Sequence, residues 1–304
     1  MGNKSSEKKF KSKRDIKDVI FYACLLAWPV IYFIVFYVCV NFNSILLAFK
    51  EYDVTTNVST FVGFDNFKRA FINFTSNADI LYALRNSFIR YIVGIVVGLT
   101  LNLSFAYFIS KGIPLSNFFK IVLFLPQIIS SMSLVVIFTF SCERLLPSMF
   151  PLISNDLLAN PNKAFPVLIF FGLWSGFGSS MLIYLGAFNN VSLDISEAAR
   201  IDGASQFREF WSIGLPMIYP TLSTFLTVGV VGVFTEQMSL LEFFPNGATA
   251  KIQTIGYYLF YNTLSAKTSE YPYLSALGLI MTAIAAPLTF FVKWALKKYG
   301  PSVD

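Results

Sequence analysis

A polar segment in the second half of the chain, EAARIDGASQFREFWSIGLP at residues 197–216, holds the side chains whose types and spacing point most directly to a function. Its Glu-Ala-Ala beginning favours a short helix, and Asp202 followed by Gly203 favours a tight turn at the end of that helix. Small alanine side chains let another protein approach the backbone closely. The chemistry that we expect here is docking to a partner.

The residues around this segment predict two short helices. Asp194 and Ser196 are residue types that cap helix N-termini, and Ser205 can cap a second helix. The apolar residues of that second helix recur at intervals of three and four: Phe207, Phe210, Trp211 and Gly214. We expect the second helix to stop near Pro216.

The sequence offers few of the residue types that catalytic and metal sites need. The chain has no histidine and only three cysteines, Cys24, Cys39 and Cys142, without CxxC spacing. A Ser-His-Asp or Cys-His site cannot be built without histidine, and no zinc site is indicated. No GxxxxGK[ST] motif for binding ATP phosphates occurs either. We therefore expect a protein that is not an enzyme and holds no cofactor itself.

The composition is that of a protein that crosses the membrane several times, with 55% hydrophobic and 13% charged residues. Apolar stretches predict six membrane helices, at about 19–40, 87–110, 118–140, 165–188, 217–235 and 273–295. The third is interrupted at Pro126 and Gln127. Two glycine pairs with GxxxG spacing, Gly94 with Gly98 and Gly172 with Gly176, predict close helix packing.

The basic residues indicate the topology. Residues 1–17 carry seven of the 23 Lys and Arg residues and predict a disordered, basic cytoplasmic tail. Together with the tail, the segments that alternate to the same side hold 14 of the 23, so both termini and the polar segment are expected in the cytoplasm. Because the basic residues cluster at the edges of the predicted spans, membrane topology explains the net charge of +6 better than binding to a nucleic acid does.

The polar segment resembles the signature loop, EAAxxDGA followed by FxxIxLP, of permease subunits of binding-protein-dependent ABC importers. The residues that carry the resemblance are Glu197, Ala198, Ala199, Asp202, Gly203, Ala204, Phe210, Ile213, Leu215 and Pro216. The resemblance implies a cytoplasmic coupling loop, residues 189–216, that sits in a groove of an ATPase subunit and passes its movement to the membrane helices. The alternative is an amphipathic connector lying on the bilayer, which would favour Lys on its polar face.

A second segment, FVGFDNF at residues 61–67, resembles sugar permeases related to the maltose and glycerol-phosphate systems. The resemblance implies an all-α membrane protein with the six-helix core of a type I ABC importer permease. It also implies a second permease subunit, two ATPase subunits that bind ATP and Mg, and an extracellular solute-binding protein. The expected parts are a tail (1–17), a first membrane helix with an outer segment (18–86), a five-helix core (87–296) and a cytoplasmic C-terminus (297–304).

The expected cargo is a mono- or oligosaccharide, because such a solute needs hydrogen-bonding groups and aromatic faces and no buried charge. Candidate side chains for the substrate path are Gln127, Ser130, Ser131, Trp174, Ser179, Ser180, Thr224 and Thr227. Glycerol-phosphate, a peptide or an amino acid remain alternatives. A gradient-driven secondary transporter is a further alternative, although ionisable residues occur only near the ends of the predicted spans.

Overall fold

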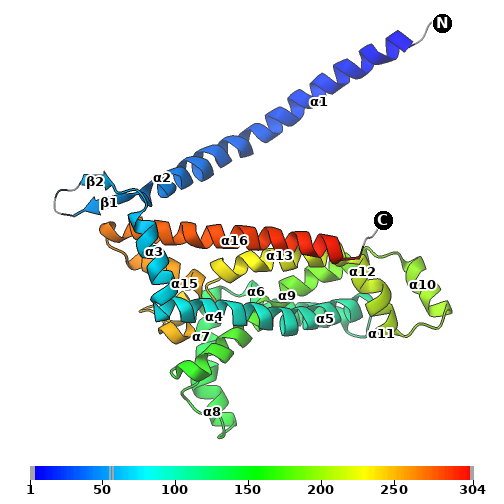
Figure 1. Ribbon diagram of the computed structural model, residues 1–304. Helices are drawn as coiled ribbons and strands as arrows, with labels where there is room; N and C mark the ends of the chain where they lie inside the picture. The colour runs from blue at the N-terminus through cyan, green and yellow to red at the C-terminus, as the bar shows by residue number, and fades with distance from the viewer. Residues whose placement is uncertain (1–3, 55, 57, 302–304) are drawn as a thin grey trace. The chain divides into compact units, whose positions relative to one another are not determined.

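The computed structural model describes residues 4–54, 56 and 58–301, and nearly all of its regular structure is helical (Figure 1). The outermost residues of the predicted tail and of the C-terminus, 1–3 and 302–304, lie outside the described part. The chain divides into two compact units. The first comprises Met1–Lys68 and Lys267–Ala276, and the second comprises Arg69–Ala266 and Leu277–Asp304.

The first unit is dominated by one long helix, built from α1 (Lys4–Tyr32), a π-helical turn η1 (Phe33–Cys39) and α2 (Val40–Leu47). Its apolar part, Ile16–Leu47, is long enough to span a membrane. The prediction of a disordered tail is wrong for residues 4–17, which continue this helix. Lys, Glu and Arg have good helix propensity, and extending a helix that the membrane span already nucleates costs little.

A small hairpin with an aromatic cluster follows in the same unit. Strand β1 (Lys50–Asp53) pairs antiparallel with β2 (Val58–Phe61), and the 3₁₀ turn η6 (Thr268–Glu270) belongs to this unit as well. The Asn66 side chain donates to the carbonyls of Ala48 and Lys50, at 3.1 and 2.7 Å. The Phe49 ring packs against three rings of the FVGFDNF segment, those of Phe61, Phe64 and Phe67. These contacts give that segment a structural role in holding the hairpin.

The second unit is a helical bundle. Helix α3 (Asp65–Ser76) leads into the second span, which consists of α4 (Ala78–Val93), the π turn η2 (Gly94–Leu99) and α5 (Thr100–Ser110). The other long helices are α9 (Pro161–Asn189), α13 (Tyr219–Thr235) and α16 (Tyr271–Tyr299), and α16 begins within the first unit. Helix α5 packs along α9, while α4 packs along α13.

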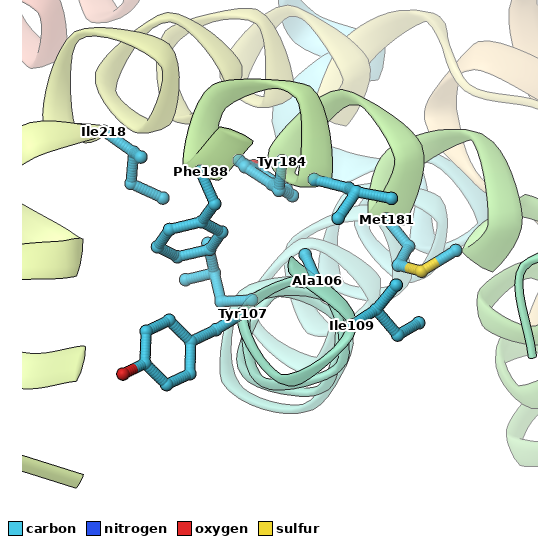
Figure 2. Close-up of a cluster of buried hydrophobic side chains, with 9 residues drawn as sticks. Ala106, Tyr107, Ile109, Met181, Tyr184, Phe188 and Ile218 are labelled. Atoms are coloured by element: carbon cyan, nitrogen blue, oxygen red, sulfur yellow. The ribbon is translucent and has the colours of Figure 1, made fainter. Parts of the chain in front are cut away.

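The interface between α5 and α9 forms a cluster of buried apolar side chains (Figure 2). Its labelled members are Ala106, Tyr107 and Ile109 from α5, Met181, Tyr184 and Phe188 from α9, and Ile218, which precedes α13. Each of these side chains is at most 6% exposed. Between membrane helices such close packing, and not removal from water, provides the attraction, so this contact fixes the second and fourth spans together.

The third span is broken into two helices, and the break lies beyond its predicted place. Helix α6 (Ser116–Ile128) contains Pro126 and ends two residues later. Ile129 and Ser130 are extended, and α7 (Ser131–Phe140) begins after them. A proline removes one backbone hydrogen bond and crowds the carbonyl four residues earlier, so it disturbs the turn before it, and α6 continues for two residues past Pro126. A π turn η3 (Ser141–Leu145) and α8 (Leu146–Met149) follow α7.

The GxxxG pairs account for less packing than predicted. A Cβ on Gly98 would lie 2.8 Å from a Leu173 methyl, so that glycine does allow close contact. A Cβ on Gly94, Gly172 or Gly176 would meet no atom within 4 Å among the described residues, apart from the neighbouring backbone of its own helix, so the prediction is wrong there. On α9 the close approach is at Gly178 instead, where a Cβ would lie 2.5 Å from the Leu123 carbonyl oxygen of α6.

The segment between α13 and α16 folds against the beginning of α4. It contains α14 (Leu240–Phe243), the 3₁₀ turn η5 (Ala250–Ile252) and α15 (Ile255–Ser265). The buried Asn86 amide donates to the carbonyls of Lys251 and Gln253, at 2.8 and 2.9 Å, and Ser87 accepts from the Ile255 N–H at 3.0 Å. Because α4 carries these contacts, the second span begins at Ala78 and not at the predicted residue 87.

Within the described residues, six helical stretches are long and apolar enough to cross a membrane. They are Ile16–Leu47, Ala78–Ser110, Ser131–Met149, Pro161–Asn189, Tyr219–Phe243 and Thr268–Tyr299. The prediction of an all-helical protein with six spans is therefore confirmed. The third stretch begins later in the chain than the predicted residue 118, because the break at Ile129 separates α6 from it.

Candidate coupling site and membrane cavity

The polar segment between the fourth and fifth spans forms two short helical pieces at one end of the bundle, beyond α5 and α9 (Figure 1). The first is α10 (Leu193–Ile201). Its N-cap is Ser192, whose hydroxyl accepts from the Asp194 N–H at 3.2 Å, so Asp194 and Ser196 lie inside the helix and do not cap it. The prediction failed because three capping residue types occur within five positions, and the first one takes the role.

Helix α10 ends at the predicted Asp-Gly turn. Gly203 has φ +76°, a conformation that glycine adopts without the steric cost of a Cβ. Its N–H donates to the Arg200 carbonyl at 3.0 Å, and the Ala204 N–H donates to the Ala199 carbonyl at 2.9 Å. This pair of bonds is a Schellman motif, which satisfies the last carbonyls of the helix. Ala199 is buried, whereas Glu197, Ala198 and Asp202 are exposed.

The second piece runs without interruption from α11 (Gln206–Glu209) through a π turn η4 (Phe210–Gly214) to α12 (Leu215–Met217). Ser205 caps it as predicted, by accepting from the Arg208 N–H at 3.3 Å. Phe210 is half-buried, and its ring centroid lies 5.0 Å from that of Tyr107 on α5. Ile213, Leu215 and Pro216 are also half-buried, so the signature residues of this piece anchor it to the bundle.

The two pieces expose three large apolar side chains among their charged ones. Ile201, Phe207 and Trp211 are 86%, 71% and 56% exposed, which is unusual for large apolar side chains outside a membrane. A groove of about 450 Å³ runs between the pieces. Its lining residues are Ile195, Ala198, Ala199, Asp202, Ala204, Arg208, Glu209, Ser212 and Ile213. The sequence analysis used Phe207 and Trp211 only as helix periodicity, although an apolar side chain in a polar loop already signals a contact surface.

A buried ion pair ties this site to the end of the second span. The Lys111 ammonium pairs with the Glu209 carboxylate and donates to the Ser196 hydroxyl at 2.8 Å. Glu209 is 3% exposed. Burial acts to raise the pKa of Glu209, but the hydrogen bond and positive charge of Lys111 outweigh it and hold that pKa below its usual value. The sequence analysis missed both residues, which lie far apart in the chain.

A cavity of about 420 Å³ lies between the second, fourth and fifth spans. Its polar wall includes the ion pair of Arg90 and Glu236, whose Nη2 and Oε2 atoms are 3.2 Å apart. Asn102, Ser180 and Tyr184 line it further. Asn102 is 9% exposed, and within the described residues its Oδ1 has no hydrogen-bond partner. The cavity is therefore lined by charged, amide and hydroxyl side chains, which can hydrogen-bond a polar solute.

Of the predicted substrate-path residues, only Ser180 lines this cavity. Ser179 donates to the Gln127 Oε1 at 2.6 Å, which joins α9 to α6. Thr224 and Thr227 donate to carbonyls of their own helix, as serine and threonine commonly do in membrane helices. The other predicted residues lie apart from the cavity: Ser130 and Ser131 flank the break before α7, and Trp174 packs near Phe138 and Phe171.

Residues 91–304 match the protein family described as the binding-protein-dependent transport system inner membrane component. The chain belongs to this family. The family's members are transport components of the membrane, so the predictions of a multi-pass membrane protein and of a permease of the binding-protein-dependent class are confirmed. The match begins inside α4 and includes the α10–α12 site and all of the cavity lining except Arg90.

Curated relatives of the same family are similar over most of their length. The multiple sugar-binding transport system permease protein MsmF of Streptococcus mutans is 25% identical, covering 84% of this chain and 88% of the relative. The diacetylchitobiose uptake system permease protein NgcF of Streptomyces coelicolor is 27% identical, covering 93% and 84%. A solved bacterial ABC transporter chain, from an importer of the acidic polysaccharide alginate, superposes with a TM-score of 0.78 at 20% identity, covering 95% and 99%. Its fold confirms the predicted architecture of an ABC importer permease.

Proposed function

We propose that this chain is the permease subunit of an ABC importer for a carbohydrate, moved by ATPase subunits that dock on the α10–α12 site. The observation that carries the proposal is the exposed face of that site. Large apolar side chains and the acidic Glu197 and Asp202 stand in solvent there, while the Schellman turn at Gly203 holds the two helical pieces rigidly. Apolar surface exposed beside satisfied backbone ends is typical of a protein interface.

The cargo class is supported by the relatives and by the cavity. Named relatives include permeases for multiple sugars and diacetylchitobiose, and others for glucose and arabinooligosaccharides. The charges of Arg90 and Glu236 balance each other inside the cavity, and the remaining polar groups are amide and hydroxyl groups. Such a lining suits a neutral, hydroxyl-rich solute, because each hydroxyl can both donate and accept a hydrogen bond.

The proposal includes the other subunits of the importer. ATP and Mg would be bound by two ATPase subunits on the cytoplasmic side, where both termini and the α10–α12 site would lie. A solved importer of this fold was obtained with a periplasmic protein that carried an alginate pentasaccharide, which supports a solute-binding protein as a further partner. A second permease subunit would complete the membrane part.

Transport into proteoliposomes tests the cargo class. The complex, purified with its neighbouring subunits, is supplied with ATP inside and with a panel of labelled solutes and their binding proteins outside. ATP-dependent accumulation of a mono- or oligosaccharide is the expected result. Accumulation of only glycerol-phosphate, a peptide or an amino acid would overturn the cargo assignment, and uptake driven by an ion gradient without ATP would overturn the importer itself.

A further inference from the structure

The Lys111 side chain connects three elements that are far apart in the chain. Lys111 follows α5 directly, at the cytoplasmic end that we propose for the second span. Its ammonium binds Ser196 on α10 and Glu209 on α11, so a single cation bridges both helical pieces of the α10–α12 site. The side chains of Lys111 and Glu209 are 15% and 3% exposed, which shields the pair from screening by salt.

The chain itself joins the α10–α12 site only to the fourth and fifth spans, α9 and α13. Contact with the second span comes from Lys111 and from Tyr107, whose hydroxyl donates to the Gln206 carbonyl at 3.1 Å. A cavity of about 400 Å³ separates much of the site from α5, and Lys111 and Glu209 lie in its wall. Packing is therefore incomplete here, and the ion pair adds a polar connection to the apolar contact of Phe210 with Tyr107.

The second span also forms one wall of the membrane cavity. Asn102 on α5 and Arg90 on α4 both line it. Asn102 lies nine positions before Lys111, which corresponds to about 14 Å along a helix at 1.5 Å per residue. Because a helix is stiff over that length, a displacement applied at Lys111 moves the cavity wall.

We infer that Lys111 is a positioning residue for transport, which passes displacement of the α10–α12 site through its bond to Glu209 to the second span and thus to the cavity. This inference rests on the proposed function, since the displacement would come from ATPase subunits. Three walls of the cavity, on the second, fourth and fifth spans, then move together. Glu209 Oε2 has no hydrogen-bond partner among the described residues, so the bond of Lys111 to Oε1 is the main contact that satisfies this buried carboxylate.

The test compares ATP hydrolysis with carbohydrate uptake in the complete reconstituted importer. Lys111→Met should keep the ATPase subunits bound and hydrolysing ATP, while the uptake per ATP falls by about fivefold or more, the lower end of usual coupling between sites. Lys111→Arg should keep near wild-type coupling. The exchanged pair, Lys111→Glu with Glu209→Lys, should recover part of what each single change loses. Lys120→Met is the matched control, because Lys120 follows in the same region and forms no ion pair within the described chain.

Each outcome decides a different point. Uptake per ATP that is unchanged in Lys111→Met overturns the inference. Loss of subunit assembly in all three Lys111 variants, the exchanged pair included, overturns it as well and makes the ion pair an anchor only. A wild-type complex that hydrolyses no ATP or imports no carbohydrate contradicts the proposed function. Because this result comes from the wild type alone, it is distinct from any effect of the Lys111 variants.

Discussion

Arg90 and Glu236 form an ion pair in the wall of the membrane cavity, with Nη2 and Oε2 3.2 Å apart, although they belong to α4 and to the end of α13. The side chains are 30% and 43% exposed, so the pair adds at most about 1 kcal/mol to stability. Its main effect is to keep the cavity neutral. The pair therefore bears on which solutes the cavity accepts.

Removing one charge of this pair should change cargo selection. In Glu236→Gln, Arg90 is left unpaired, so we expect weaker uptake of the neutral carbohydrate and inhibition by acidic sugars. The double variant Arg90→Gln with Glu236→Gln should lose that inhibition. Uptake competition in proteoliposomes measures both effects. Identical inhibition profiles for the wild type and Glu236→Gln would show that the pair lies off the solute path.

Filling the cavity from a glycine should block uptake without harming the fold. Gly172 lines the cavity, and a Cβ there meets nothing within 4 Å outside the glycine's own stretch of helix, so Gly172→Leu places a side chain into open space. We expect uptake to fall at least about tenfold, because even a small misplacement of a substrate can reduce a rate by a large factor. Gly186→Leu on the same helix is the control, since Gly186 is exposed and lines no cavity described above. Equal uptake by both variants would contradict the assignment.

Gly178 should be the least replaceable glycine of α9. In Gly178→Ala the new methyl would lie 2.5 and 2.6 Å from backbone atoms of Leu123 and Phe124, which cannot move aside without shifting α6. Overpacking of this kind costs roughly 1–3 kcal/mol. Gly176→Ala, two positions earlier, should be nearly neutral because its Cβ meets nothing. Thermal unfolding in detergent gives both values, and a Gly178→Ala protein as stable as Gly176→Ala would show that these helices do not touch there.

The Glu209 carboxylate should make stability depend on pH. Its pKa is lowered in the folded protein, so its contribution is fully present above the unfolded pKa of about 4.3 and is lost as the pH falls through the lower folded value. We expect Glu209→Gln to be less stable by about 1.5–3 kcal/mol at pH 7, the usual effect of a hydrogen bond to a charged group. The difference in Tm should shrink below pH 4.3. A difference that grows on acidification would contradict this direction.

Much of this fold could be predicted from patterns of neighbouring residues in the sequence. Apolar runs predicted the six spans, and Asp202 with Gly203 predicted the turn that ends α10, because both depend on neighbouring residues only. Contacts between distant segments were not predictable. The place where α6 breaks, the beginning of α4 at Ala78 and the Lys111–Glu209 pair depend on which helices meet in space.

The candidate side chains for the cargo stay a prediction, and the structure shows only which of them lie near the cavity. Gln127, Ser179 and Thr227 have the right chemistry, yet the first two bond to each other and the last to its own helix. Asn102 is as polar as these residues and lies in the cavity with an unpaired oxygen. Residue type alone cannot separate such cases, because the direction of a side chain in a bundle is set by helix packing.

The most direct test of the central claim asks whether ATPase subunits bind the α10–α12 site. The chain is purified from membranes with its neighbouring subunits, and ATP hydrolysis is measured for the wild type, Glu197→Arg and Gly203→Pro. Glu197 is exposed, and the φ of +76° at Gly203 is closed to proline, so both changes alter the docking surface while the membrane helices still insert. Glu51→Arg, an exposed acid on β1, is the control.

The account predicts that an ATPase subunit co-purifies with the wild type and with Glu51→Arg, and that Glu197→Arg and Gly203→Pro lose the subunit or hydrolyse ATP without transport. Wild-type uptake by either of the two loop variants would contradict the docking role of α10–α12. If no ATPase subunit ever associates with the wild-type chain, the importer assignment itself is wrong.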